Sequence, residues 1–155
     1  DDFTRLVITD NQQILKIEFV NEVSYFAAKP LKYDFGWIDT PRNILSNKLS
    51  ALIGRDEPKD IYDIVHIALN YSFSWPQMFL DAKEKCIINE IDVEKRLTSF
   101  PVQLLENINW LGNKIDMQHF STLKKQIADD FLLGASNSLG FGKISIEKAE
   151  PFEKP

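Results

Sequence analysis

Two cations, Lys48 and Arg55, are followed along the chain by two carboxylates, Asp60 and Asp63. Helical periodicity places all four beside the apolar faces of their helices, where charged groups are costly to bury. One interpretation is structural: a lysine that snorkels to water, and an aspartate favoured at a helix N-terminus by the helix dipole. The other is functional: the four charges belong to a site that opens beside the helices.

The spacing of these residues gives their directions. At about 100° per residue, Lys48 falls between Ile44 and Leu52, so it leaves its helix at the edge of the apolar face. Arg55, seven positions on, lies within about 20° of Lys48 if the helix continues that far. The two aspartates are three positions apart, which places them on one side of a second helix.

The elements that must carry these residues are two amphipathic helices within residues 41–70. The first is predicted to start after an N-cap at Thr40 or Asp39, with Pro41 at the first helical position, where its missing N–H costs nothing. The turn 54–58, Gly-Arg-Asp-Glu-Pro, is rich in residues that end helices. Ile61, Ile64, Val65, Ala68 and Leu69 then have the spacing of one buried helical face.

An antiparallel hairpin is predicted before these helices, with strands at 3–9 and 14–20 and a turn at 10–13. Alternation places Leu15, Ile17 and Phe19 on one face and Lys16, Glu18 and Val20 on the other. Glu18 is therefore either an ordinary solvent-facing residue or a carboxylate that the sheet presents to a cleft.

The remainder is predicted to be helical, with helices near 74–86, 89–100, 101–109 and 119–133. A small sheet followed by helices gives an α+β fold. We expect a first unit at 1–56, a helical unit at 57–139 and a loose tail at 140–155.

Composition limits the function. The 155-residue chain has a net charge of −5 and a sequence pI of about 5.1, which argues against general DNA or RNA binding. The single cysteine, Cys86, allows no internal disulfide and no cysteine-based zinc site, so we expect a cytoplasmic protein. An apolar run long enough to cross a membrane is not found in the sequence.

Walker A, G-x-G-x-x-G, H-E-x-x-H and G-x-S-x-G motifs do not occur. A resemblance does occur over residues 14–70. LKIEF at 15–19, NKLSALIGR at 47–55 and KDIYDI at 59–64 together resemble the AbiEii/AbiGii-type nucleotidyltransferase toxin family. That family belongs to the DNA polymerase β-like nucleotidyltransferase superfamily. Its pattern here is an acidic strand residue, a helix with Lys, then Arg, then basic-Asp-x-x-Asp.

The resemblance implies a site with magnesium and a nucleoside triphosphate. Glu18 would be the third of three metal-binding carboxylates, acting beside the metal or as a base. Lys48 would contact triphosphate oxygens and Arg55 could share that charge. Asp60 and Asp63 would orient these cations, or one of them would act on the nucleotide or acceptor. The acceptor would be an RNA end or a protein hydroxyl, and a cognate antitoxin would be a further partner.

The chain departs from the family pattern before the Glu18 strand. The family's Gly-Ser motif and its Asp-x-Asp pair belong there, and the first thirteen residues contain neither. The chain also begins at Asp1, directly before a strand, so we expect a trimmed or incomplete N-terminus. We therefore expect the C-terminal portion of a longer toxin or phage-defence enzyme, inactive by itself. The alternatives are a degenerate nucleotide- or protein-binding module, or an unrelated α+β domain.

Overall fold

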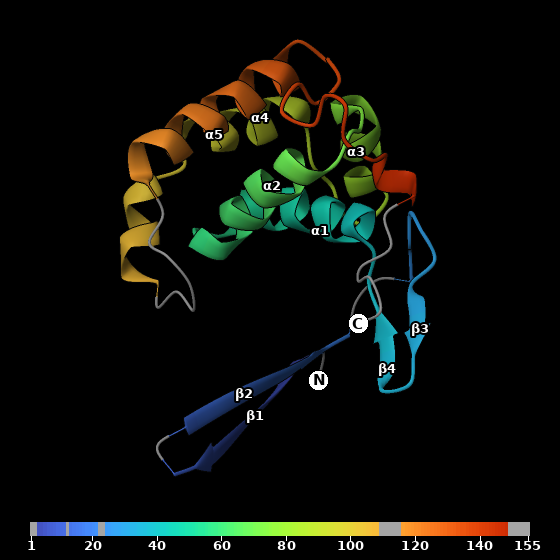
Figure 1. Cartoon of the computed structure of the whole chain (residues 1–155), viewed down its shortest axis with the longest axis vertical. Coiled ribbons are helices and arrows are strands. Elements are labelled where there is room, and N and C mark those ends of the chain that lie inside the picture. Colours follow the sequence, from blue (N-terminus) through green and yellow to red (C-terminus); the bar gives the residue numbers. More distant parts are fainter. Residues whose placement is uncertain (1–2, 12, 22–23, 109–115, 149–155) are drawn as a thin grey trace.

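The computed structural model describes residues 3–11, 13–21, 24–108 and 116–148. It has the predicted α+β fold, in which the predicted antiparallel hairpin and a second, smaller one precede a helical body. The elements are β1 (Phe3–Asp10), β2 (Gln13–Val20), β3 (Leu31–Tyr33), β4 (Gly36–Ile38), α1 (Pro41–Gly54), α2 (Pro58–Asn70), α3 (Trp75–Lys83), α4 (Glu90–Ser99), the 3₁₀ helix η1 (Val102–Asn107), α5 (Met117–Leu132) and the 3₁₀ helix η2 (Ile146–Lys148). The helices gather in one body, and the β1–β2 hairpin lies apart from it (Figure 1).

Helix α1 begins as its sequence predicts. The Thr40 side chain accepts a hydrogen bond from the backbone N–H of Asn43, and Pro41 occupies the first turn. The helix ends at Gly54, and Arg55 is already extended, with φ −154° and ψ 157°. Helix α2 starts four residues later, so Lys48 and Asp60 come from neighbouring helices joined by a short connection.

The core of the helical body is built by apolar side chains from all five α-helices, η1 and η2. Its largest fully buried members are Trp75, Leu45, Leu49, Leu52, Ile61, Ile64, Met78, Leu97, Leu105, Ile127, Val65 and Val93. Helix α1 packs on α2, α3 and α4, so the core includes helices on both sides of the predicted boundary at residue 56.

The described part of the predicted loose tail is packed. Ile146 is 3% exposed, and Ser72 forms a parallel bridge with Ser145. A Cβ atom added to Gly140 would lie 1.9 Å from the carbonyl oxygen of Tyr71, so the chain passes too close here for a side chain. In the segment expected to be a loose tail, the burial of Ile146 and the close approach at Gly140 thus hold these two residues beside Tyr71 and Ser72, which follow α2.

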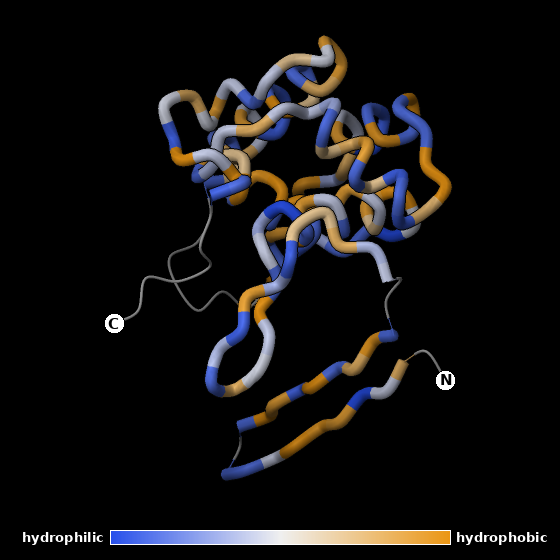
Figure 2. Tube along the Cα trace, turned by 90° about the vertical axis from the view of Figure 1, so that its right-hand side faces the viewer, coloured by the Kyte–Doolittle hydropathy of each residue, from blue (hydrophilic) through white to orange (hydrophobic). Residues whose placement is uncertain are grey.

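The β1–β2 hairpin has the predicted strands and alternation, but its side chains are mostly exposed. Leu6 lies opposite Ile17 and Ile8 opposite Leu15, so the middle of one face is apolar. The other face carries Arg5 opposite Glu18. Every described residue of the hairpin is exposed except Ile17, which is half-buried. Figure 2 shows the alternating apolar residues on two strands that lie apart from the helical body.

The other differences from the sequence predictions are local. The β3–β4 hairpin was not among the predicted elements, and its Gly36 has a φ of 144°, which favours glycine. The helix predicted at 101–109 is the 3₁₀ helix η1. Cys86, the single cysteine, is exposed.

Candidate functional site

The carboxylate of Asp60 is the centre of the candidate site. It is fully buried, with 0% of its side chain exposed. Arg55 donates from Nε to Oδ2 at 2.7 Å and from its terminal nitrogen to Oδ1 at 3.0 Å, and Lys48 donates to Oδ1 at 2.9 Å. Asp60 thus holds both cations, and its burial on the first turn of α2 fixes where they lie.

Lys48 joins the second carboxylate to this group. Its Nζ atom lies 2.7 Å from Oδ2 of Asp63, whose side chain is 37% exposed. The Lys48 side chain is 23% exposed and that of Arg55 is 59% exposed. The four residues, called the Asp60 cluster below, run from a buried carboxylate outward to two cations that reach the surface.

The hydrogen bonds of the cluster favour the charged forms of Asp60, Lys48 and Arg55. Burial raises the pKa of Asp60, but hydrogen bonds from Arg55 and Lys48 outweigh it and hold the pKa below its ordinary value. Burial lowers the pKa of Lys48, yet hydrogen bonds to Asp63 and Asp60 leave it raised. The pKa of Arg55 is raised, chiefly by its hydrogen bond to Asp60.

Glu18 is the one predicted site residue that the structure leaves outside the cluster. It lies on β2, where its carboxylate pairs with Arg5 at 2.7 Å, with the two side chains 46% and 53% exposed. It is near enough to add a weak attraction that helps to raise the pKa of Arg55. The structure therefore brings four of the five predicted residues together, and places the fifth on the neighbouring hairpin.

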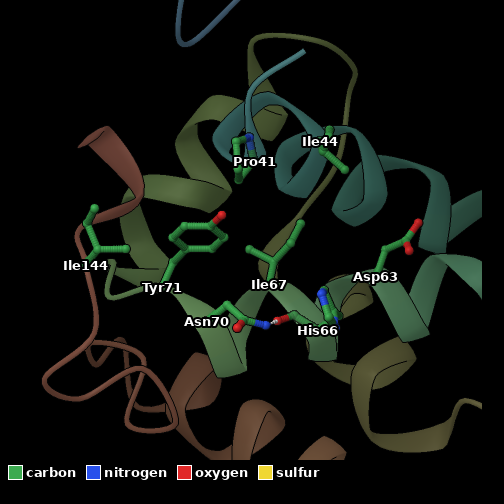
Figure 3. Close-up of a pocket in the computed structure, with 8 residues that line it drawn as sticks. All are labelled: Pro41, Ile44, Asp63, His66, Ile67, Asn70, Tyr71 and Ile144. Carbon is green, nitrogen blue, oxygen red and sulfur yellow. Dashed lines mark hydrogen bonds between the residues drawn. The ribbon is translucent and has the colours of Figure 1, made fainter. Parts of the chain in front are cut away.

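A groove of about 560 Å³ adjoins the cluster at Asp63. Four apolar and four polar residues line it: Pro41, Ile44, Ile67 and Ile144, with Asp63, His66, Asn70 and Tyr71. Figure 3 shows Asp63 and Ile144 at opposite ends and Asn70 hydrogen-bonded to the His66 carbonyl. The sequence analysis missed this groove, although the spacing of residues 63, 66, 67 and 70 along one side of α2 could have indicated a shared face.

A second buried ion pair also escaped the sequence analysis. Arg42 forms a two-pronged contact with Asp81 at 2.7 and 2.9 Å and contacts Glu147 at 2.6 Å. The Asp81 side chain is 3% exposed. This group ties the start of α1 to α3 and η2. Because its partners are 39 and 105 positions away in sequence, no local pattern could have revealed it.

Within the described ranges, three or more His, Cys, Asp or Glu side chains do not group as a metal site would require. The residue that the resemblance assigns to magnesium, Glu18, pairs with a cation. Among the helices that the structure describes, none is long and apolar enough to cross a membrane.

Comparisons of the chain with known protein families, with curated protein sequences and with solved structures find no match.

Proposed function

We propose that this chain is the C-terminal portion of a metal-dependent nucleotidyltransferase that transfers a nucleotide to an RNA end or a protein hydroxyl. The observation that carries the proposal is the Asp60 cluster, in which a fully buried carboxylate holds two cations that reach the surface. The buried carboxylate of Asp60 positions both cations, and the partly exposed Asp63 supplies the second negative charge, so the contact between Lys48 and Asp63 is the one that a ligand phosphate can replace.

In this role Lys48 and Arg55 bind the triphosphate. The contact with Asp60 uses two of the five N–H groups of the Arg55 guanidinium, so others are available to phosphate oxygens. Lys48 acts as a point charge that exchanges Asp63, its more exposed partner, for a phosphate oxygen. Asp60 orients both cations and does not transfer a proton, because both of its oxygens accept from cations.

Glu18 contributes the third metal-binding carboxylate in this proposal. The magnesium would need the Asp-x-Asp pair that this sequence lacks, and Glu18 would leave Arg5 to reach it. The apolar face of the β1–β2 hairpin, uncovered among the described residues, supports a larger sheet that would bring these carboxylates together. The same family resemblance supports a role as a cytoplasmic toxin or phage-defence protein. A cognate antitoxin would then be its partner.

A second candidate is a non-catalytic module that binds a nucleotide or a protein. The observation in its favour is the pairing of Glu18 with Arg5, which occupies the carboxylate that the resemblance assigns to metal. Both candidates predict nucleotide or partner binding at the cluster, and only the first predicts transfer.

The test compares nucleotide transfer by the 155-residue chain with transfer by the product of its complete reading frame. With magnesium and a labelled nucleoside triphosphate, we expect transfer only from a product that supplies Gly-Ser and Asp-x-Asp. Glu18→Ala should abolish it, whereas Glu106→Ala, an exposed glutamate on η1, should not. A reading frame without these motifs, or transfer that survives Glu18→Ala, would overturn the catalytic proposal.

A further inference from the structure

A second groove lies on the helical body, between α3, α4 and α5, and the Asp60 cluster does not use it. Its volume is about 240 Å³. The floor includes the nearly buried rings of Phe79 and Phe131, and the rim includes Ile91 and Leu132, which are 76% and 67% exposed. Exposed apolar side chains scattered singly are ordinary, but here they adjoin an apolar groove with polar residues beside it, as at interaction sites.

Two carboxylates lie on one side of this groove. Glu90 and Glu94 are four positions apart on α4, so they follow one another along the same side of the helix. Glu94 accepts a hydrogen bond from Thr98 through Oε1, at 2.9 Å, which holds its side chain in place. On α3, Nζ of Lys83 lies 5.6 Å from the centre of the Phe79 ring.

The size of the groove indicates what it accepts. Small-molecule pockets usually have about 300–1,000 Å³, and this groove is smaller and continues into exposed apolar side chains. It suits one or two apolar side chains of a larger partner. Such anchors supply most of the binding energy at protein interfaces.

The charges indicate which partner. The two carboxylates are four residues apart, about 6 Å along the helix axis, which is the spacing of cations at i and i+4 on a partner helix. A second copy of this chain is disfavoured, because the chain carries a net charge of −5 and would bring the same two glutamates against themselves.

We propose that the α3–α4–α5 groove docks an amphipathic helix of another protein, with apolar residues in the groove and Lys or Arg beside Glu90 and Glu94. This follows the general mode in which a helix lays its apolar face in a groove. The proposal does not depend on nucleotide binding or transfer, because it concerns a different face of the helical body.

The test uses the 155-residue chain and two synthetic amphipathic helices, one of leucine and lysine and one of leucine and glutamate. Fluorescence anisotropy measures binding of each labelled peptide. We expect the lysine peptide to bind and the glutamate peptide to bind at least about tenfold more weakly. Added salt should weaken the lysine peptide's binding, since the contacts to the rim are electrostatic.

Leu132→Glu tests the groove, and Phe141→Glu is its matched control, because Phe141 is 91% exposed and does not line the groove. We expect Leu132→Glu to weaken binding of the lysine peptide at least about tenfold, and Phe141→Glu to leave that binding unchanged. The double variant Glu90→Lys/Glu94→Lys should reverse the preference between peptides. Circular dichroism checks that each variant folds.

Three results would overturn the proposal: no binding of the lysine peptide by the wild-type chain, equal binding of both peptides, or equal effects of Leu132→Glu and Phe141→Glu. Sedimentation adds a fourth. If the wild-type chain forms dimers that Leu132→Glu abolishes, the occupant of the groove is a second copy and not a basic helix.

Discussion

The helical body and the β1–β2 hairpin use similar apolar residues to very different effect. In the helical body, Leu49 is completely buried between packed helices. In the hairpin, Leu15 occupies an equally regular pattern but is 56% exposed. A two-stranded hairpin is marginal in water without further cover. A regular apolar pattern thus predicts whether a segment forms a helix or a strand. How much that segment stabilises the protein depends on how far its apolar side chains are buried.

The same contrast separates the charged residues. Asp60 is buried between two cations in the helical body, while Glu18 pairs with Arg5 on the surface of the hairpin. A surface ion pair contributes roughly 0–1 kcal/mol to the free energy of unfolding. Removing one partner of a buried ion pair lowers it far more, because the remaining charge is left buried without a partner. The candidate site therefore depends on the helical body for its geometry.

The largest expected effect compares one substitution in the two regions. Leu49→Ala should lower the free energy of unfolding by about 3–5 kcal/mol, because it leaves a cavity among packed helices. Leu15→Ala should change it by less than about 0.5 kcal/mol. Urea unfolding followed by circular dichroism measures both. Equal losses would mean that the hairpin is part of the same core.

The next effect concerns the buried carboxylate. Asp60→Ala should lower the free energy of unfolding by about 3 kcal/mol, near the low end for a broken buried pair, because Lys48 and Arg55 can turn toward water. Asp63→Asn, at a more exposed position beside the same lysine, should cost less than about 1 kcal/mol. If both variants unfold at the same urea concentration, Asp60 is not the centre of the cluster.

A smaller effect tests the packing of residues 140–148. Gly140→Ala should cost about 1–3 kcal/mol, because the new Cβ would lie 1.9 Å from the Tyr71 carbonyl and the backbone must shift. Gly54→Ala is the matched control, since a Cβ there meets nothing within 4 Å. It should leave stability unchanged or raise it by up to about 1 kcal/mol. A Gly140→Ala variant as stable as Gly54→Ala would show that this segment is loose.

The smallest expected effect is a dependence on pH. The pKa of Asp60 is lower in the folded protein, so its contribution is complete above the unfolded value of about 3.9 and is lost as pH falls through the folded value. The raised pKa of Lys48 gives a contribution that is complete below about 10.4 and is lost at higher pH. The difference in unfolding free energy between wild type and Asp60→Asn should therefore be constant between these limits and shrink in acid. A difference that grows in acid would contradict the assigned charges.

Short-range patterns predicted much of the fold and of the candidate site. Alternation gave the hairpin faces, and Thr40 caps α1 as expected. Helical spacing directed Lys48 and Asp60 toward the same apolar surface, and the short turn between the two helices brings them together. These features depend on residues that are close in sequence, where geometry leaves few choices.

Features that join distant segments could not be predicted. Arg42 meets Glu147 across 105 positions, and Gly140 is required only because Tyr71 lies against it. The 3₁₀ form of η1 and the exposure of Cys86 also depend on what packs nearby. The exposed position of Glu18 likewise follows from the hairpin's lack of cover, which alternation alone does not reveal.

The most direct test of the proposed nucleotide site is calorimetric titration of the 155-residue chain with a magnesium nucleoside triphosphate. Lys48→Gln is compared with Lys125→Gln, whose lysine is 75% exposed and pairs only with Asp129 in the described structure. We expect binding by wild type and Lys125→Gln, and at least about tenfold weaker binding by Lys48→Gln. Absence of binding by wild type, or equal binding by the two variants, would contradict the proposed site.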